Sequence, residues 1–90
     1  MTIEELVRKR NGNIKRYRTY HGGHYIPGGE VTWSVEHVNG YDTLSHYGVL
    51  LAFAAEGEVF LSDYSLSNDL SVSDRNGIDI FRSVHATAGV

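Results

Sequence analysis

The dipeptide Asn39-Gly40 most restricts what this chain can fold into, because it separates two segments of alternating polarity. Asparagine and glycine both accept positive φ angles, which the tight turn of a two-residue β-hairpin requires. The sequence therefore predicts an antiparallel hairpin closed at this point. Its register would pair Val38 with Tyr41, Val35 with Leu44, and Trp33 with His46.

A second tight turn is predicted at Glu56-Gly57, where Phe53 would pair with Phe60 and Ala52 with Leu61. The two registers agree, because alternation puts a mainly apolar set on one face and a polar set on the other. The apolar set is Val31, Trp33, Val35, Leu44, Leu50, Ala52, Ala54, Val59 and Leu61; the polar set is Thr32, Ser34, Glu36, Thr43 and Ser45. This agreement predicts a three-stranded antiparallel meander, to which residues 14–20 add a fourth strand.

Two helices are expected at the ends of the chain. Thr2 and Glu5 form a capping box, after which Ile3, Leu6 and Val7 share one helical face until Asn11-Gly12 ends the helix. Ser71 and Asp74 form a second box, which opens a helix to about Val84 with Ile78, Phe81 and Val84 on one face. The predicted class is α+β, a three- to four-stranded antiparallel meander sheet with a short N-terminal helix and a C-terminal helix. Residues 1–90 form a single domain of ordinary size.

Some large apolar residues fall on the face that should be solvated. Three explanations are open: a helix covers them, Gly48 sits in a bulge that shifts the register, or a partner binds there. The third predicts a protein-interaction surface for a homodimer or another protein. Its residues would be Tyr47, Val49, Leu51, Phe53, Phe60 and Tyr64.

The charge is unevenly distributed along the chain. Residues 1–20 hold six Lys and Arg against two Glu, whereas residues 21–90 hold two Arg against nine acids. Bases interleaved with aromatic rings are typical of single-strand binders, in which cations neutralise phosphates and rings stack on bases. The alternative function is therefore nucleic-acid binding through residues 8–25, by Arg8, Arg10, Lys15, Arg16, Tyr17, Arg18 and Tyr20. A simpler explanation is that cations suit the end of a helix and protect an edge strand from pairing.

Several classes of site and location are disfavoured. The chain has no cysteine, which excludes disulfides and thiolate metal sites and fits a reducing cytoplasm. Its start, MTIEELVRKR, lacks the apolar run of a signal peptide, and its longest apolar stretch, residues 49–55, is too short to span a membrane. We therefore expect a soluble cytoplasmic protein that does not enter membranes.

Candidate catalytic and metal-binding residues lack the context that chemistry requires. His21 and His24 share a glycine-rich loop, but no third ligand is evident, and His46 beside Trp33 is expected to be a neutral, hydrogen-bonded core histidine. Asp42 or Asp63 could approach a histidine, yet no nucleophile or phosphate-binding motif accompanies them. We predict a non-enzymatic protein with no cofactor and no metal.

The segments Tyr47-Gly-Val-Leu-Leu-Ala-Phe and Gly57-Glu-Val-Phe-Leu-Ser-Asp-Tyr-Ser-Leu-Ser67 resemble small uncharacterised domains encoded by tailed bacteriophages. The resemblance covers a third to a half of the chain. It departs from the usual pattern at residues 66–73, which are longer than the tight Thr-Thr cap of those domains. It implies an accessory phage protein without an assigned reaction, which would act in the host cytoplasm. With the exposed apolar set, it leads us to expect a protein-interaction module that acts on a host protein or on a second copy. It transfers no catalytic residue.

Overall fold

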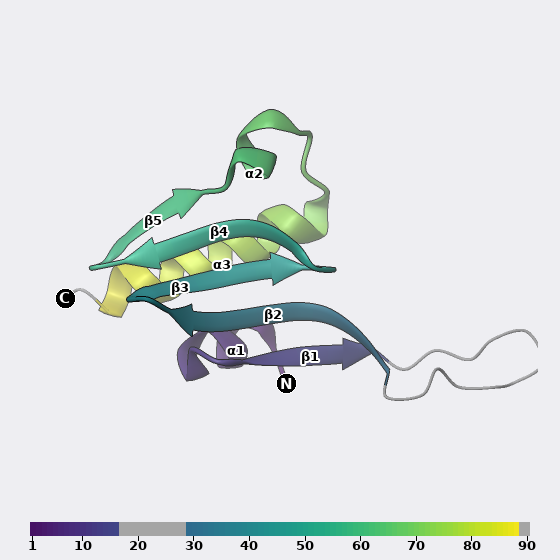
Figure 1. Ribbon diagram of the computed structural model, residues 1–90, viewed down its shortest axis with the longest axis horizontal. Coiled ribbons are helices and arrows are strands. Elements are labelled where there is room, and N and C mark those ends of the chain that lie inside the picture. The colour runs from purple at the N-terminus through teal and green to yellow at the C-terminus, as the bar shows by residue number, and fades with distance from the viewer. Residues whose placement is uncertain (17–28, 89–90) are drawn as a thin grey trace, which may run out of the picture.

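The computed structural model describes residues 1–16 and 29–88, and it is built on one antiparallel sheet of five strands. Each strand pairs with the next along the chain, as Figure 1 shows. The strands are β1 (Gly12–Arg16), β2 (Glu30–Val38), β3 (Tyr41–His46), β4 (Val49–Ala55) and β5 (Glu58–Leu61). The helices are α1 (Ile3–Lys9), α2 (Asp63–Ser67) and α3 (Val72–Ala88). The predicted α+β class is confirmed, with one strand more than expected.

The additional strand arises at Tyr47-Gly48, which forms a third two-residue turn. Both residues have positive φ, 50° and 79°, like those of the turns at residues 39–40 and 56–57. The predicted registers across the other two turns are confirmed. The turn at residues 47–48 folds β4 back onto β3, so that Val49 lies opposite His46. Val49 therefore shares a face with His46.

Two bulges decide which side chains enter the core. Thr32 is the extra residue in β2 opposite β1, and Leu51 is the extra residue in β4 opposite β3. Both are buried, although alternation had placed them on the solvated face. Val31 and Leu50 were expected in the core but are 39% and 40% exposed, because each bulge reverses the alternation beyond it.

The bulge in β4 is held by α2, a short helix that the sequence pattern did not predict. The Ser62 hydroxyl donates to the carbonyl of Leu50 at 2.7 Å, and the Ser65 hydroxyl donates to that of Leu51 at 2.7 Å. The Ser62 side chain also accepts the N–H of Ser65, which caps the helix. These bonds occupy carbonyl groups at the bulge.

The helices α1 and α3 cover one face of the sheet and enclose the core (Figure 1). The hydroxyls of Thr2 and Ser71 cap the two helices by accepting the N–H groups of Glu5 and Asp74 at 3.1 Å. The predicted box is complete at Ser71, whose N–H donates to Asp74 Oδ2, whereas the Glu5 carboxylate accepts from the Thr2 hydroxyl. Gly77 lies in α3 against the Trp33 ring, and a Cβ atom there would overlap the ring. The core consists of Leu6, Val7, Trp33, Val35, Leu44, Leu51, Ala52, Ala54, Ile78, Phe81 and Val84. We call the face of the sheet against which α1 and α3 pack the covered face, and the opposite face the open face.

Candidate functional site

The open face carries a row of three aromatic rings across neighbouring strands. Tyr41 on β3 lies 5.9 Å from Phe53 on β4, and Phe53 lies 5.4 Å from Phe60 on β5, measured between ring centroids. Tyr41 is 45% exposed, Phe60 is 42% exposed, and Phe53 between them is half-buried. We call these three residues the aromatic row. In the described part of the chain, no helix packs over it.

The predicted interaction surface is therefore divided between two places. Phe53 and Phe60 belong to the aromatic row, but the other four residues do not lie on the open face. Leu51 is 1% exposed, so its predicted place on the solvated face is wrong. Together with His46, Ser71 and Asp74, these four residues line a pocket of about 310 Å³: Tyr47, Val49, Leu51 and Tyr64.

Sequence reasoning missed Tyr41, although the signal was present. Pairing Val38 with Tyr41 puts Tyr41 on the same face as Thr43, and the confirmed register places Thr43 opposite Phe53. Extending the alternation by one residue would have added Tyr41 to the exposed apolar set. Val38, its neighbour on β2, is also exposed.

His46 lies beside the pocket and stacks on Trp33, with 3.9 Å between ring centroids. This confirms its predicted place beside Trp33, but the His46 side chain is 14% exposed and lies at the edge of the buried core. Its Nδ1 lies 2.6 Å from Asp74 Oδ1. Burial raises the pKa of Asp74, but hydrogen bonds from His46 and Ser71 outweigh this effect, so the pKa is lowered. Because an ionised carboxylate only accepts, Nδ1 of His46 carries the proton.

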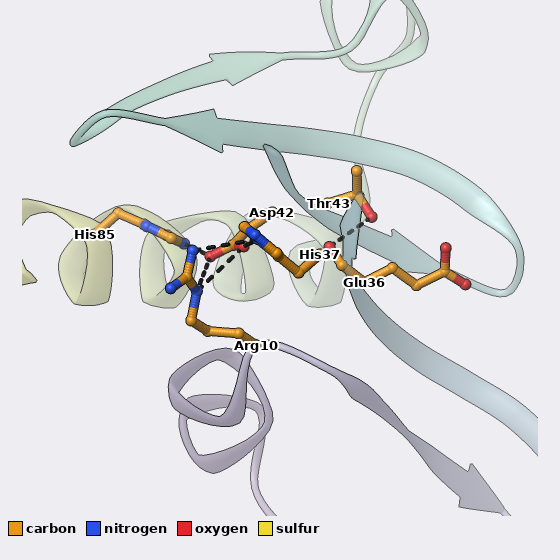
Figure 2. Close-up of polar contacts among 6 residues, drawn as sticks. All are labelled: Arg10, Glu36, His37, Asp42, Thr43 and His85. Carbon is orange, nitrogen blue, oxygen red and sulfur yellow. Dashed lines mark hydrogen bonds and ion pairs between the residues drawn. The ribbon is translucent and has the colours of Figure 1, made fainter. Parts of the chain in front are cut away.

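A second polar cluster is centred on Asp42, which is 1% exposed. Figure 2 shows the side chains of Arg10, His37 and His85 converging on this carboxylate. Arg10 Nε lies 3.0 Å from Oδ2 and 3.3 Å from Oδ1, and His37 Nδ1 lies 2.5 Å from Oδ1. His85 Nε2 is buried 3.5 Å from Oδ2 and makes no hydrogen bond within residues 1–16 and 29–88. The cluster thus connects the end of α1, the β2–β3 hairpin and α3.

Local structure brings Arg10 to this carboxylate. Arg10 ends α1 in the left-handed conformation, with φ of 64°, and its N–H bonds back to Leu6 and Val7. His37 and Asp42 face each other because their register follows from the turn at residues 39–40. His85 arrives from a distant helix, α3, and only tertiary packing brings it close.

The charges of the cluster stabilise the ionised form of Asp42. Burial raises its pKa, but hydrogen bonds from Arg10 and His37, with the attraction of Arg10 and His85, lower it overall. Burial also lowers the pKa of His85, an effect that the Asp42 charge only partly opposes. His37 donates through Nδ1, since the ionised carboxylate can only accept, and this nitrogen then cannot also accept from Arg10 Nη2, which lies 3.2 Å away. The cluster therefore links α1, the β2–β3 hairpin and α3 through polar contacts.

Beside this cluster lies a pocket of about 760 Å³, between the end of α1, the β4–β5 turn and α3. Its charged lining is of both signs, with Arg8 and Arg10 against Asp42 and Glu56, so it does not select one sign of ligand. Within residues 1–16 and 29–88, no three histidines or carboxylates are grouped in a way that could hold a metal ion.

The predicted nucleic-acid residues are only partly described. Arg10 binds Asp42. Arg8 is in the last turn of α1, and its Nη2 lies 3.7 Å from Glu4 Oε1. Lys15 and Arg16 are exposed on β1 at one end of the strand order. Tyr17, Arg18 and Tyr20 lie outside the described residues, as do His21 and His24. The described cations therefore do not form a continuous row of unpaired charges.

No family model, no curated protein and no solved structure matches this chain. In the part of the chain that the structure describes, no helix is both long and apolar enough to cross a membrane.

Proposed function

We propose that this chain is a non-enzymatic accessory protein of the cytoplasm that binds a protein through the open face of its sheet. The aromatic row is the observation that supports this function. Fully burying an aromatic side chain removes about 150–250 Å² from water, so Tyr41 and Phe60 each leave roughly 65–110 Å² exposed. These partly exposed rings, over which no described helix packs, support binding of a protein at this face, because aromatic residues are enriched at interfaces.

The two histidine–aspartate clusters support binding over catalysis. The Asp42 carboxylate accepts from Arg10 and His37, and the Asp74 carboxylate accepts from His46 and from the start of α3. Each carboxylate therefore joins separate elements of the fold. These contacts give both carboxylates a role in stabilising the fold.

The resemblance of residues 47–67 to phage accessory domains suggests where such a partner would be found. Accessory proteins of this kind work among host proteins, so the partner would be a host protein or a second copy of the chain. The absence of cysteine is consistent with work in a reducing cytoplasm.

Site-specific photo-crosslinking in the producing cell tests the proposal. Phe60 is replaced by p-benzoylphenylalanine, which keeps a large aromatic side chain on the open face. The matched control carries the same group at Leu66, which is 70% exposed on α2. We expect a discrete protein adduct from position 60 and none from position 66. Equal labelling from both positions, or no protein adduct from position 60, contradicts the proposal.

The nucleic-acid alternative rests on the exposed Lys15 and Arg16 of β1. Binding of single-stranded DNA or RNA should then weaken steeply with salt, and the Arg16→Ala, Arg18→Ala double variant should bind less tightly than the Arg75→Ala, Arg82→Ala control. Absence of binding at low salt would rule it out.

A further inference from the structure

We infer that the free edge of β5 receives an extended, basic segment of the partner protein, which pairs with it as an added strand of the sheet. This inference rests on the proposed function and names the chemistry of its partner. The sheet has two edge strands, β1 and β5, because its strand order follows the chain (Figure 1). An edge strand presents backbone N–H and C=O groups that no neighbouring strand occupies, and an extended peptide can pair with them.

The two edges differ in how they are protected from pairing. Lys15 and Arg16 are exposed on β1, and the bulge at Thr32 interrupts the register of β1 with β2. Charged side chains, above all Lys, and bulges are the usual protection of an edge. The sequence of β5 is EVFL, without Lys or Pro, and its register with β4 is unbroken. Of the two edges, β5 is therefore the one open to a further strand.

The hairpin register shows which backbone groups of β5 point outward. The turn between β4 and β5 is two residues long, so the residues that flank it form a hydrogen-bonded pair. Bonded and non-bonded pairs alternate along antiparallel strands, so Glu58 and Phe60 bond to β4. Ser62 continues this series, because its N–H donates to a carbonyl of β4 at 2.9 Å. The N–H and C=O groups of Val59 and Leu61 therefore point away from β4, on a side where no described strand pairs with β5.

The side chains of β5 offer apolar contacts to an added strand on both faces of the sheet. Val59 and Leu61 are partly buried and pack against the core on the covered face. Phe60 is 42% exposed on the open face, at the end of the aromatic row. A residue placed opposite Val59 or Leu61 would extend the core, and one opposite Phe60 would extend the aromatic row. The added strand should therefore carry apolar or aromatic residues at these positions.

The charge beside the edge determines the sign of the partner. Glu58 on β5 and Asp63 at the start of α2 are exposed, and among the described residues neither has an ion-pair partner. Residues 56–74 contain acidic residues but no Lys or Arg. Opposite charges on directly paired residues stabilise a sheet, whereas like charges destabilise it. A Lys or Arg opposite Glu58 is therefore favoured, and an acidic segment is disfavoured.

Amide hydrogen exchange, measured by NMR on the purified chain, tests the pairing. The probe is the capped peptide Lys-Val-Tyr-Val-Lys, whose valines lie opposite Val59 and Leu61 in antiparallel alignment, with the tyrosine opposite Phe60 and a lysine opposite Glu58. Only two residues offer outward groups, so binding should be weak and the peptide is used at millimolar concentration. We expect exchange at the N–H groups of Val59 and Leu61 to slow severalfold, and exchange at Glu58 and Phe60 to change less. Unchanged exchange at Val59 and Leu61 overturns the inference.

Two controls separate backbone pairing and charge from non-specific binding. N-methylation of both valines of the peptide removes the donors that Val59 and Leu61 would accept from, and it should abolish the protection. Glu58→Lys should weaken binding about tenfold, and a peptide with glutamate in place of both lysines should then bind this variant better than the natural chain. Glu36→Lys, at an exposed position on β2, is the matched control and should have a much smaller effect. Circular dichroism confirms that both variants are folded. Equal effects of the two substitutions, or undiminished binding of the N-methylated peptide, overturn the inference.

Photo-crosslinking in the cell separates this inference from the proposed function. If the adduct from position 60 is lost in the Glu58→Lys chain and kept in the Glu36→Lys chain, both are supported. If the adduct persists unchanged in the Glu58→Lys chain, the edge inference fails and the proposed function stands. If position 60 captures nothing in the otherwise natural chain, the proposed function itself fails.

Discussion

On the covered face, the buried Asp42 carboxylate meets Arg10 and His37, and the partly buried Asp74 carboxylate meets His46. On the open face, Tyr41 on β3, Phe53 on β4 and Phe60 on β5 leave aromatic rings partly exposed. One face thus buries charge with its partners, and the other leaves apolar surface without one. The difference separates residues that stabilise the fold from residues available for binding. Substitutions on the two faces should therefore affect different measurements.

The largest effect is expected from Phe81→Ala on α3, at the centre of the covered face. Phe81 is fully buried, so the truncation removes its transfer free energy and leaves a cavity. We expect a loss of about 3–5 kcal/mol in the free energy of unfolding, measured by urea denaturation. A loss below about 1 kcal/mol would mean that α3 does not pack as described.

Asp42→Ala should be the next most severe change. It removes the carboxylate that Arg10 and His37 bind and leaves His85 without the negative charge beside its buried Nε2. We expect a loss of about 2–4 kcal/mol, since hydrogen bonds to charged groups are among the stronger ones and Arg10 itself can return to water. Arg8→Ala is the matched control, because its ion pair with Glu4 is exposed and should contribute little. Equal midpoints for the two variants would contradict the role of Asp42.

Gly77→Ala should destabilise the fold, although the same substitution usually stabilises a helix. In a helix interior, alanine is usually about 1 kcal/mol more favourable than glycine. Here the added Cβ would overlap the Trp33 ring, so we expect a destabilisation of about 1–3 kcal/mol. In a Trp33→Leu background the same change should become neutral or stabilising. A stabilising Gly77→Ala in the natural sequence would show that the ring does not lie on this helix.

Most of the sheet was predictable because turn chemistry is local. Asn39-Gly40 and Glu56-Gly57 gave the correct registers. The turn at residues 47–48 was missed, although it has the same form as the predicted turn at Glu56-Gly57, a positive-φ residue followed by glycine. Bulges have no comparable signal: Leu50, Leu51 and Ala52 are all apolar, so the pattern could not show which of them faces outward.

The sites were less predictable than the strands, because turn chemistry is local whereas most contacts of the sites are between distant parts of the chain. His37 and Asp42 follow from a hairpin register, but Arg10 and His85 reach the carboxylate only through the packing of two helices. The predicted interaction surface depended on unbroken alternation through β4. The bulge at Leu51 and the turn at residues 47–48 therefore placed Tyr47, Val49 and Leu51 at the pocket beside α3, and the unpredicted helix α2 placed Tyr64 there. Phe53 and Phe60 lie beyond both features and kept their predicted face.

Acid should destabilise the covered face in two steps. Burial holds the pKa of His85 below its ordinary value of 6.5, so the folded chain binds this proton less readily than the unfolded chain. The stability that neutral His85 contributes is therefore fully present above pH 6.5. It is lost as the pH falls below 6.5 and through the lowered pKa of the folded chain. The lowered pKa values of Asp42 and Asp74 give a second loss as the pH falls below 3.8. Urea midpoints across this range should show both steps in the natural chain and only the lower one in His85→Gln. A urea midpoint that stays constant across this pH range contradicts both expected losses of stability.

The smallest effect on folding is expected from Phe60→Ala, the same substitution as at Phe81 but on the open face. Phe60 is already 42% exposed, and its main loss is the ring contact with Phe53. We expect a loss of about 1 kcal/mol or less in the free energy of unfolding, measured by urea denaturation of dilute protein. A loss as large as that of Phe81→Ala in dilute protein would show that Phe60 belongs to the core, and the contrast between the two faces would fail.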